Sequence, residues 1–190
     1  MTAGQKIIIG GTDYDRNLSG IDSSTNAIIT IDSVHHEIHE GDHFYIQGYV
    51  ELDDEDDFYL KLVTPPGLKL AHFIFAINST GITETFLDED ADGGMAGGSA
   101  ITPLNSDRNS SNTSVITLTG DVAANVSYTT RLEHDKWGAD GFKESIGGGT
   151  AREDELILKA DTIYCRGIIS HSNNNLIQFK ASWYEHTDSN

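Results

Sequence analysis

The chain has 190 residues, enough for one domain with a substantial hydrophobic core. Its 30 acidic residues outnumber its 12 lysines and arginines, and the formal net charge of −18 argues against nucleic acid or an anionic membrane surface as a partner. A single cysteine, Cys165, excludes an internal disulfide and a cysteine zinc cluster, and its strand-like surroundings predict a buried thiol. The N-terminal residues lack the apolar stretch of a signal peptide, so we expect a protein that is made in the cytoplasm and stays soluble.

Helical periodicity is nearly absent, whereas short apolar or alternating runs recur between turn residues. The clearest run covers residues 176–184, where apolar residues such as Phe179 and Trp183 alternate with polar ones and predict a strand with one buried face. Residues 68–77 are apolar on both faces, which predicts a central strand. In chain order, the predicted strands cover residues 6–9, 27–31, 43–51, 58–63, 68–77, 82–87, 114–118, 125–132, 162–169 and 176–184.

These strands and their turn-rich spacers predict an all-β fold, an antiparallel β-sandwich or jelly roll with long polar loops. Residues 27–190 are predicted to form a single β-sandwich domain, and residues 1–26 an N-terminal arm or extended segment. A helical turn is predicted only at residues 152–158, where three acidic residues precede an apolar triplet.

A histidine-rich segment holds four of the eight histidines within residues 35–43. His39 and His43 frame an H-E-x-x-H string, which in zinc peptidases lies on a helix that presents both imidazoles to the metal. Gly41 and Asp42 disfavour such a helix, and an extended chain would separate the two imidazoles unless these residues form a turn. His39 and His43 are therefore metal candidates, but a short strand near Ile38 with histidines in packing or subunit contacts is the favoured interpretation.

Two acidic loops offer oxygen ligands for a cation. Asp88, Asp90 and Asp92 match the opening of an EF-hand loop, in which carboxylates converge on Ca²⁺. Ser99 stands where the bidentate glutamate belongs, so a complete EF-hand is excluded, and Ca²⁺ at an incomplete loop remains an alternative to a solvated acidic turn. Residues 53–57 are five consecutive acidic residues, which favour an exposed loop over a cation site.

Catalytic chemistry is not predicted by any pattern in the chain. No Ser-His-Asp or Cys-His set stands out, and carboxylates are so frequent that pairs of them carry no information about glycoside hydrolysis. We therefore predict no catalytic residues, no enzyme activity and no obligatory cofactor. Arg108, in a polar loop rich in amides and hydroxyls, is instead a candidate for contact across a subunit interface.

Four stretches of the chain resemble motifs of a group of tailed-phage proteins: residues 35–44, 105–110, 147–159 and 181–188. They occur in the same order as in that group and together span about residues 30–188. The group is similar to virion structural proteins that are usually encoded beside head genes. The resemblance supplies no catalytic residues. The residues that we consider for contacts in the particle are His35, His36, His39, Arg108 and Arg152.

The resemblance implies a component of the virion. Among such components, an acidic, cysteine-poor, β-rich domain with glycine- and asparagine-rich loops favours a capsid decoration, or cement, protein on the surface of the virion. Such a protein would be made in the host cytoplasm, bind the major capsid protein as a homo-oligomer, with a trimer favoured, and stabilise the head. A head-fibre, neck or tail component is the first alternative. A glycan-binding β-sandwich that attaches the particle to its host is the second, with Tyr45, Tyr49 and Tyr184 as aromatic contacts. A zinc hydrolase built on His39, Glu40 and His43 is the least favoured.

Overall fold

The computed structural model describes residues 8–9, 12–13, 33–67, 69–125, 127–138, 146–148 and 155–187. The chain divides into two units, Met1–Ser33 and Val34–Asn190. In the first unit, β1 (Ile8–Ile9) pairs antiparallel with β2 (Thr12–Asp13). The predicted strand at residues 27–31 and the predicted end of the arm at residue 26 lie outside the described residues.

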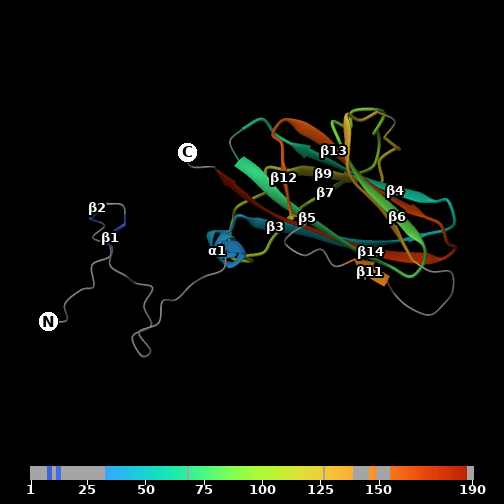
Figure 1. Ribbon diagram of the computed structural model, residues 1–190, viewed down its shortest axis with the longest axis horizontal. Helices are drawn as coiled ribbons and strands as arrows, with labels where there is room; N and C mark the ends of the chain where they lie inside the picture. Colours follow the sequence, from blue (N-terminus) through green and yellow to red (C-terminus); the bar gives the residue numbers. More distant parts are fainter. Residues whose placement is uncertain are drawn as a thin grey trace, which may run out of the picture. The chain divides into compact units, whose positions relative to one another are not determined.

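The second unit is an antiparallel β-sandwich, which confirms the predicted fold class (Figure 1). One sheet, called sheet I here, has the order β11-β5-β14-β3-β8, with β12 also paired to β5; the other, sheet II, has the order β10-β6-β13-β4-β9-β7. Sheet I contains β3 (His43–Leu52), β5 (Lys69–Ser79), β8 (Leu104–Asn105), β11 (Ile146–Gly148), β12 (Leu156–Leu158) and β14 (Asn175–Thr187). Sheet II contains β4 (Asp57–Thr64), β6 (Thr83–Glu89), β7 (Ser99–Ile101), β9 (Thr117–Gly120), β10 (Thr130–Trp137) and β13 (Thr162–Ser170).

The main core lies between the two sheets and follows from strand alternation. In β14, Ile177, Phe179, Ala181 and Trp183 are buried while their neighbours are at least partly exposed, as the sequence predicted. Each fully buried large apolar side chain contributes roughly 1.5–3 kcal/mol. Aromatic and aliphatic residues of β3, β4, β5, β6 and β13 complete this core: Phe44, Ile46, Leu60, Leu62, Phe73, Phe75, Ile77, Leu87, Tyr164 and Ile168.

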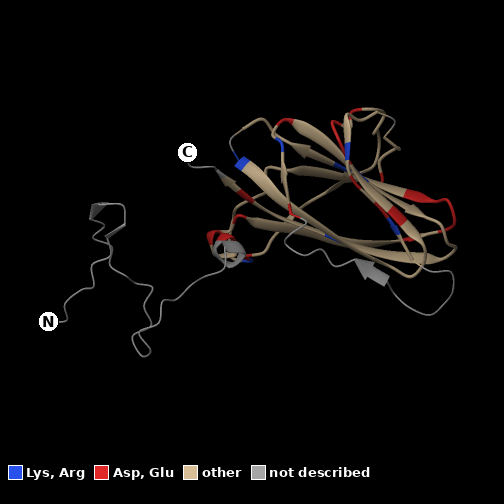
Figure 2. Cartoon of the chain, viewed as in Figure 1, with Lys and Arg blue, Asp and Glu red and all other residues tan. Residues whose placement is uncertain are grey.

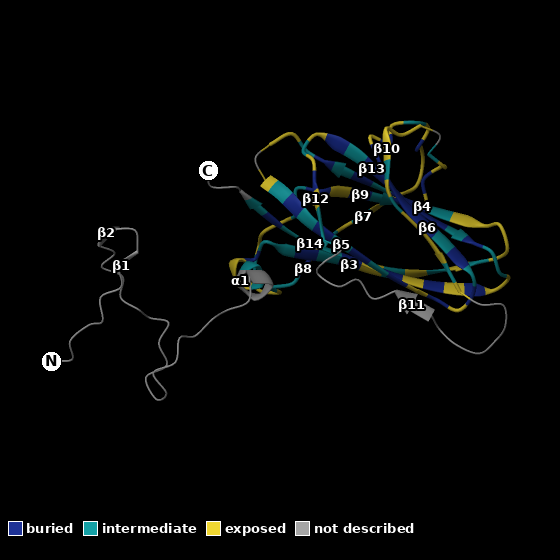
Figure 3. Ribbon diagram, viewed as in Figure 1, coloured by how far each residue is buried: buried dark blue, intermediate teal, exposed yellow. Residues whose placement is uncertain are grey.

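The outer faces of the two sheets differ (Figure 3). On sheet II, a second apolar cluster joins Tyr59, Phe86 and Cys165 to Met95 and Val122, which belong to loops that cross this face. The thiol of Cys165 is fully buried, as predicted, and burial raises its pKa to about 12. The outer face of sheet I instead presents polar and aromatic side chains to solvent.

Several sequence predictions require correction. The strand predicted at residues 125–132 corresponds to β10, which begins five residues later. Of the helical turn predicted at residues 152–158, the last three residues form the strand β12 instead. Ile157 of β12 pairs with His72 of β5, so pairing with a long neighbouring strand prevails over local helix propensity. The short strands β7, β8 and β11 carry too few residues for alternation to reveal them.

The histidine-rich segment forms a helix, α1 (Ser33–Glu40), where a short strand was predicted. Gly41 ends the helix with φ of +76°, its amide bonding the Ile38 carbonyl at 3.0 Å while the Asp42 amide bonds the Glu37 carbonyl at 3.0 Å. These two bonds form a Schellman cap, the ending that a glycine in the left-handed conformation favours. The described residues contain no helix that is long and apolar enough to cross a membrane.

Candidate functional site

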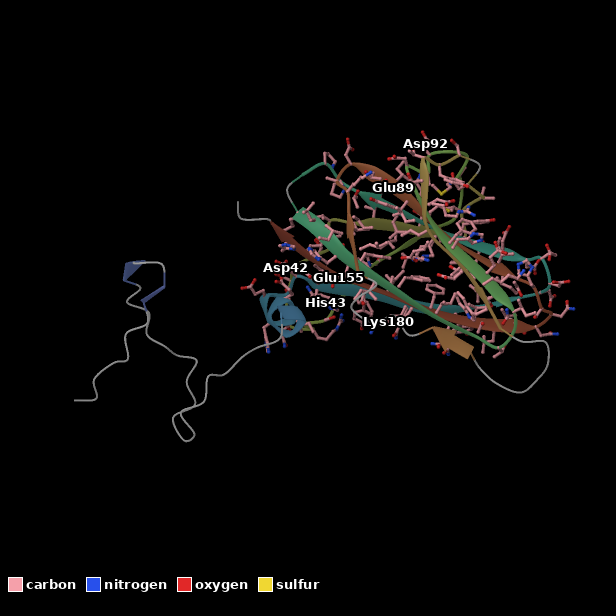
Figure 4. The ribbon with its side chains drawn as sticks, in the orientation of Figure 1. Asp42, His43, Glu89, Asp92, Glu155 and Lys180 are labelled. Carbon is pink, nitrogen blue, oxygen red and sulfur yellow. The ribbon has the colours of Figure 1, made fainter. Side chains whose placement is uncertain are left out.

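Parts of the four motif segments lie at the end of sheet I that adjoins α1, and we call this region the motif corner; of the third segment, Glu155 and β12 lie there, whereas Gly147 and Gly148 pair with the far end of β5. Asp42 and His43 lead from α1 into β3, and Glu155 lies close by before β12 (Figure 4). Tyr184 of β14 pairs directly with His43, and the Glu185 amide donates to the Asp42 carbonyl at 2.9 Å. Segments that are more than one hundred residues apart in the chain therefore share one hydrogen-bonded region.

Asn105 attaches the polar loop that follows β8 to the cap of α1. Its amide nitrogen donates to the Gly41 carbonyl at 2.7 Å, and its amide oxygen accepts from the Asp107 amide at 2.9 Å. A Cβ on Gly41 would overlap Ser110 of the same loop, so both the positive φ and this close approach require glycine. Hydrogen bonds and close packing therefore join the first two motif segments.

Glu185 is a fully buried carboxylate at the inner side of the motif corner. It accepts hydrogen bonds from the Ser114 hydroxyl at 2.5 Å, the Val115 amide at 3.1 Å and the Trp183 indole at 3.0 Å. These bonds tie the segment before β9 of sheet II to β14 of sheet I. Sequence reasoning did not identify this role, although the alternation that buries every second residue from Ile177 to Trp183 places Glu185 on the same inner face.

The outward side of the motif corner carries a histidine–glutamate–tyrosine cluster. His72 Nδ1 lies 2.6 Å from Glu155 Oε1 and 2.9 Å from the Tyr184 hydroxyl, which itself donates to Glu155 at 2.9 Å. The imidazole of His72 is stacked on Tyr184, with ring centroids 4.4 Å apart, and packs against His186 at 4.6 Å. These contacts join β5 and β14 to the segment that precedes β12, and the Nε2 atom of His72 is buried without a hydrogen-bond partner among the residues that the structure describes.

The H-E-x-x-H string does not have the geometry of a zinc peptidase. The helix ends at Glu40, so His39 and Glu40 lie on its last turn and are exposed, while His43 begins β3. The Nδ1 atom of His43 lies 2.6 Å from the Ser106 hydroxyl, and burial together with Lys180 lowers the pKa of His43. The side chains of His35, His36 and Arg152 lie outside the described residues.

The three aspartates of the EF-hand-like stretch are not brought together as metal ligands. Asp88 is almost fully buried and receives two hydrogen bonds from Arg131, at 2.7 and 3.1 Å. The guanidinium also lies over the Phe86 ring, 4.0 Å from its centroid. Asp90 and Asp92 lie in the exposed turn beyond β6 and do not join Asp88 in a converging group. The structure thus places Asp88 in a salt bridge rather than in an open loop.

Exposed contact residues occur on the loop and on the outer face of sheet I. Arg108 is exposed, and one of its nitrogens lies 3.4 Å from the Asn105 carbonyl, so the charge faces solvent at the motif corner. Farther along β3, Tyr49 is 72% exposed. Tyr45 shares its face of the strand and lies under the ammonium of Lys180 at 5.7 Å.

Comparison with known proteins adds no assignment to this geometry. No protein-family model matches the chain, and neither the curated proteins nor the solved structures give a match. The class established by the structure is therefore an all-β antiparallel sandwich.

Proposed function

We propose that the protein is a structural component of a tailed-phage particle, in the form of a decoration protein that binds the major capsid protein and stabilises the head. The observation that carries the proposal is that residues from each of the four motif segments, among them Asp42, Asn105, Glu155 and Tyr184, lie together at one corner. Hydrogen bonds between side chains at this corner hold α1, the loop that carries Arg108 and two strands in place. The corner therefore provides a rigid platform for docking. Its work is binding, without a catalytic residue or cofactor.

The net charge of −18 supports docking on a basic shell surface. Attachment driven by exposed ion pairs weakens when salt is added, because the screening length falls from roughly 10 Å at 0.1 M to 3 Å at 1 M. We propose a homo-oligomer, with a trimer favoured, on the outer surface of the virion, after synthesis in the host cytoplasm. Native mass spectrometry of the full chain measures this oligomeric state directly.

The first experiment is quantitative mass spectrometry of gradient-purified particles of the phage that encodes this chain. A copy number close to that of the major capsid protein, or a simple lattice fraction of it, supports decoration. A few copies per particle assign the chain to a head fibre, neck or tail, and absence from clean particles refutes the virion assignment.

A docking experiment then tests the motif corner. Arg108→Ala is expected to weaken binding of the purified protein to particles that lack it, even though the variant is more acidic, because the substitution removes an exposed side chain that would contact the shell directly at the corner. Lys136→Ala is a matched control, since Lys136 is 53% exposed on β10 of sheet II. Equal binding of both variants and the unmodified protein would place the docking surface elsewhere.

A glycan-binding function is the second candidate, and the tyrosines of β3 favour it. Tyr49 and Tyr45 lie on the same face of one strand, at a spacing suited to stacking against sugar rings. Tyr184 lies on this face as well, but its hydroxyl is bonded to Glu155. Screening against a glycan array, with Tyr49→Ala as the comparison, tests this function: binding lost in the variant supports it, and no binding by the unmodified protein refutes it.

A further inference from the structure

The end of the sandwich opposite α1 brings potential metal ligands together from two separate turns. Asp54 and Glu55 lie in the turn between β3 and β4, and His171 follows β13. Ligand atoms of these three side chains lie within 4.8 Å of one another. In the part of the chain that the structure describes, no other group of histidine, cysteine and acidic side chains converges in this way. Figure 2 shows acidic residues at this end of the ribbon.

The backbone holds the two turns in register. The Glu55 amide donates to the Ser170 carbonyl at 2.9 Å, and the Ser170 amide donates to the Asp56 carbonyl at 2.9 Å. The Asn174 amide also donates to the Asp53 carboxylate at 3.0 Å. The position of His171 relative to the acidic turn is therefore set by hydrogen bonds outside the three ligand side chains, and the ligands are held close together before any ion binds.

An outer carboxylate orients the imidazole of His171. Its Nε2 atom lies 3.0 Å from Glu84, while its Nδ1 atom faces Glu55 at 3.1 Å. Glu84 is itself fixed by His134, whose Nε2 lies at 2.8 Å. Metal-binding histidines characteristically donate the proton of one nitrogen to a carboxylate and present the other nitrogen to the metal. In His171, Glu84 occupies the orienting position at Nε2, and a metal at Nδ1 would take the place of the contact with Glu55.

We propose that Asp54, Glu55 and His171 bind a zinc ion, with Glu84 as the carboxylate that positions the imidazole. Zinc accepts a mixed set of imidazole nitrogen and carboxylate oxygens, and three protein ligands leave a coordination position for water. Ca²⁺ prefers oxygen ligands alone, so the imidazole distinguishes this site from a general acidic turn. The Glu55 side chain is 75% exposed, which predicts weaker zinc affinity than that of a closed structural site.

Isothermal titration calorimetry of the untagged full-length protein with ZnCl₂ tests the site. We expect one zinc per chain at this end, and His171→Gln or Asp54→Asn is expected to weaken the affinity by at least about tenfold. His134→Gln is the matched control, because His134 contacts the same Glu84 but lies outside the ligand set. This control is expected to lose less zinc affinity than His171→Gln or Asp54→Asn, since it changes only the support of Glu84 and no ligand. Far-ultraviolet circular dichroism verifies the fold of each variant.

Two further measurements separate this site from other zinc binding. In nuclear magnetic resonance titrations, the imidazole of His171 is expected to shift at lower zinc concentration than those of the histidine-rich segment. A parallel titration with CaCl₂ is expected to be insensitive to His171→Gln. Unchanged zinc affinity in His171→Gln, equal loss in His134→Gln, or the absence of zinc binding at millimolar concentration would overturn the proposal. The outcome is independent of whether the protein decorates a capsid.

Discussion

Arg166 and Glu133 form an ion pair whose two halves are expected to respond very differently to substitution. Arg166 points from β13 into the main core, where its guanidinium lies 4.4 Å from the centroid of the Phe75 ring and 2.5 Å from Glu133. The exposed fraction is 2% for the arginine side chain and 30% for the glutamate. Burial lowers the pKa of Arg166, because the low-dielectric interior disfavours its charge, while Glu133 opposes this effect.

Glu133→Gln leaves a buried guanidinium without its carboxylate, and removal of one partner of a buried pair costs about 3–5 kcal/mol. We expect Glu133→Gln to lower the free energy of unfolding by about 3 kcal/mol, the low end of this range, because Asp135 also stabilises the charged arginine. Arg166→Met removes the buried charge, keeps an unbranched side chain against Phe75, and leaves a carboxylate that water can reach. Loss of the cation–π contact destabilises the protein, and removal of a buried charge stabilises it. These effects offset each other, so the free energy of unfolding is expected to change by no more than about 1 kcal/mol.

Urea and thermal unfolding of the two variants measure this difference. For a domain of this size, about 3 kcal/mol corresponds to a decrease in melting temperature of roughly 6–12 °C for Glu133→Gln. Glu51→Gln is the matched control, since Glu51 is exposed on β3 and the substitution removes the same charge. If Arg166→Met destabilises the protein as much as Glu133→Gln, the ion pair is a net source of stability and the reasoning is refuted.

Three further outcomes are expected. Glu185→Gln should lower the free energy of unfolding by about 2–3 kcal/mol in urea denaturation, because an amide cannot accept every bond that the buried carboxylate receives; an unchanged value would contradict the role of Glu185. Cys165 should resist alkylation at pH 8 in the folded protein and react only after unfolding, since burial raises its pKa to about 12. Hydrogen bonds with Glu84 and Glu55 raise the pKa of His171, so its contribution to stability is complete below the ordinary value of 6.5 and is lost as pH rises through the raised value. Hydrogen bonds from His134 and His171 lower the pKa of Glu84, whose contribution is complete above 4.5 and is lost as pH falls through the lowered value. Melting temperatures from pH 4 to 8 should therefore depend less on pH in His171→Gln, and an identical profile would contradict this coupling.

The long strands could be predicted because alternation is a local property of the chain. Residues 176–184 show the period of two that buries Trp183, and β14 contains them. The residues of α1 do not predict a helix, because Gly41 and Asp42 are unfavourable inside one, whereas in the structure they form its cap. Leu156–Leu158 was assigned to a helical turn because nothing in these residues signals the neighbouring strand β5.

The sequence by itself determined the all-β class, the buried cysteine and the order of the main strands, since each depends on residue type and local periodicity. The tertiary structure alone decided which polar groups meet. It placed Asp88 against Arg131, buried Glu185 beside Trp183, and brought His171 to the acidic turn from a position more than one hundred residues away. The physical reason is that strand pairing and sheet packing join segments distant in the chain, and no local pattern records these long-range contacts.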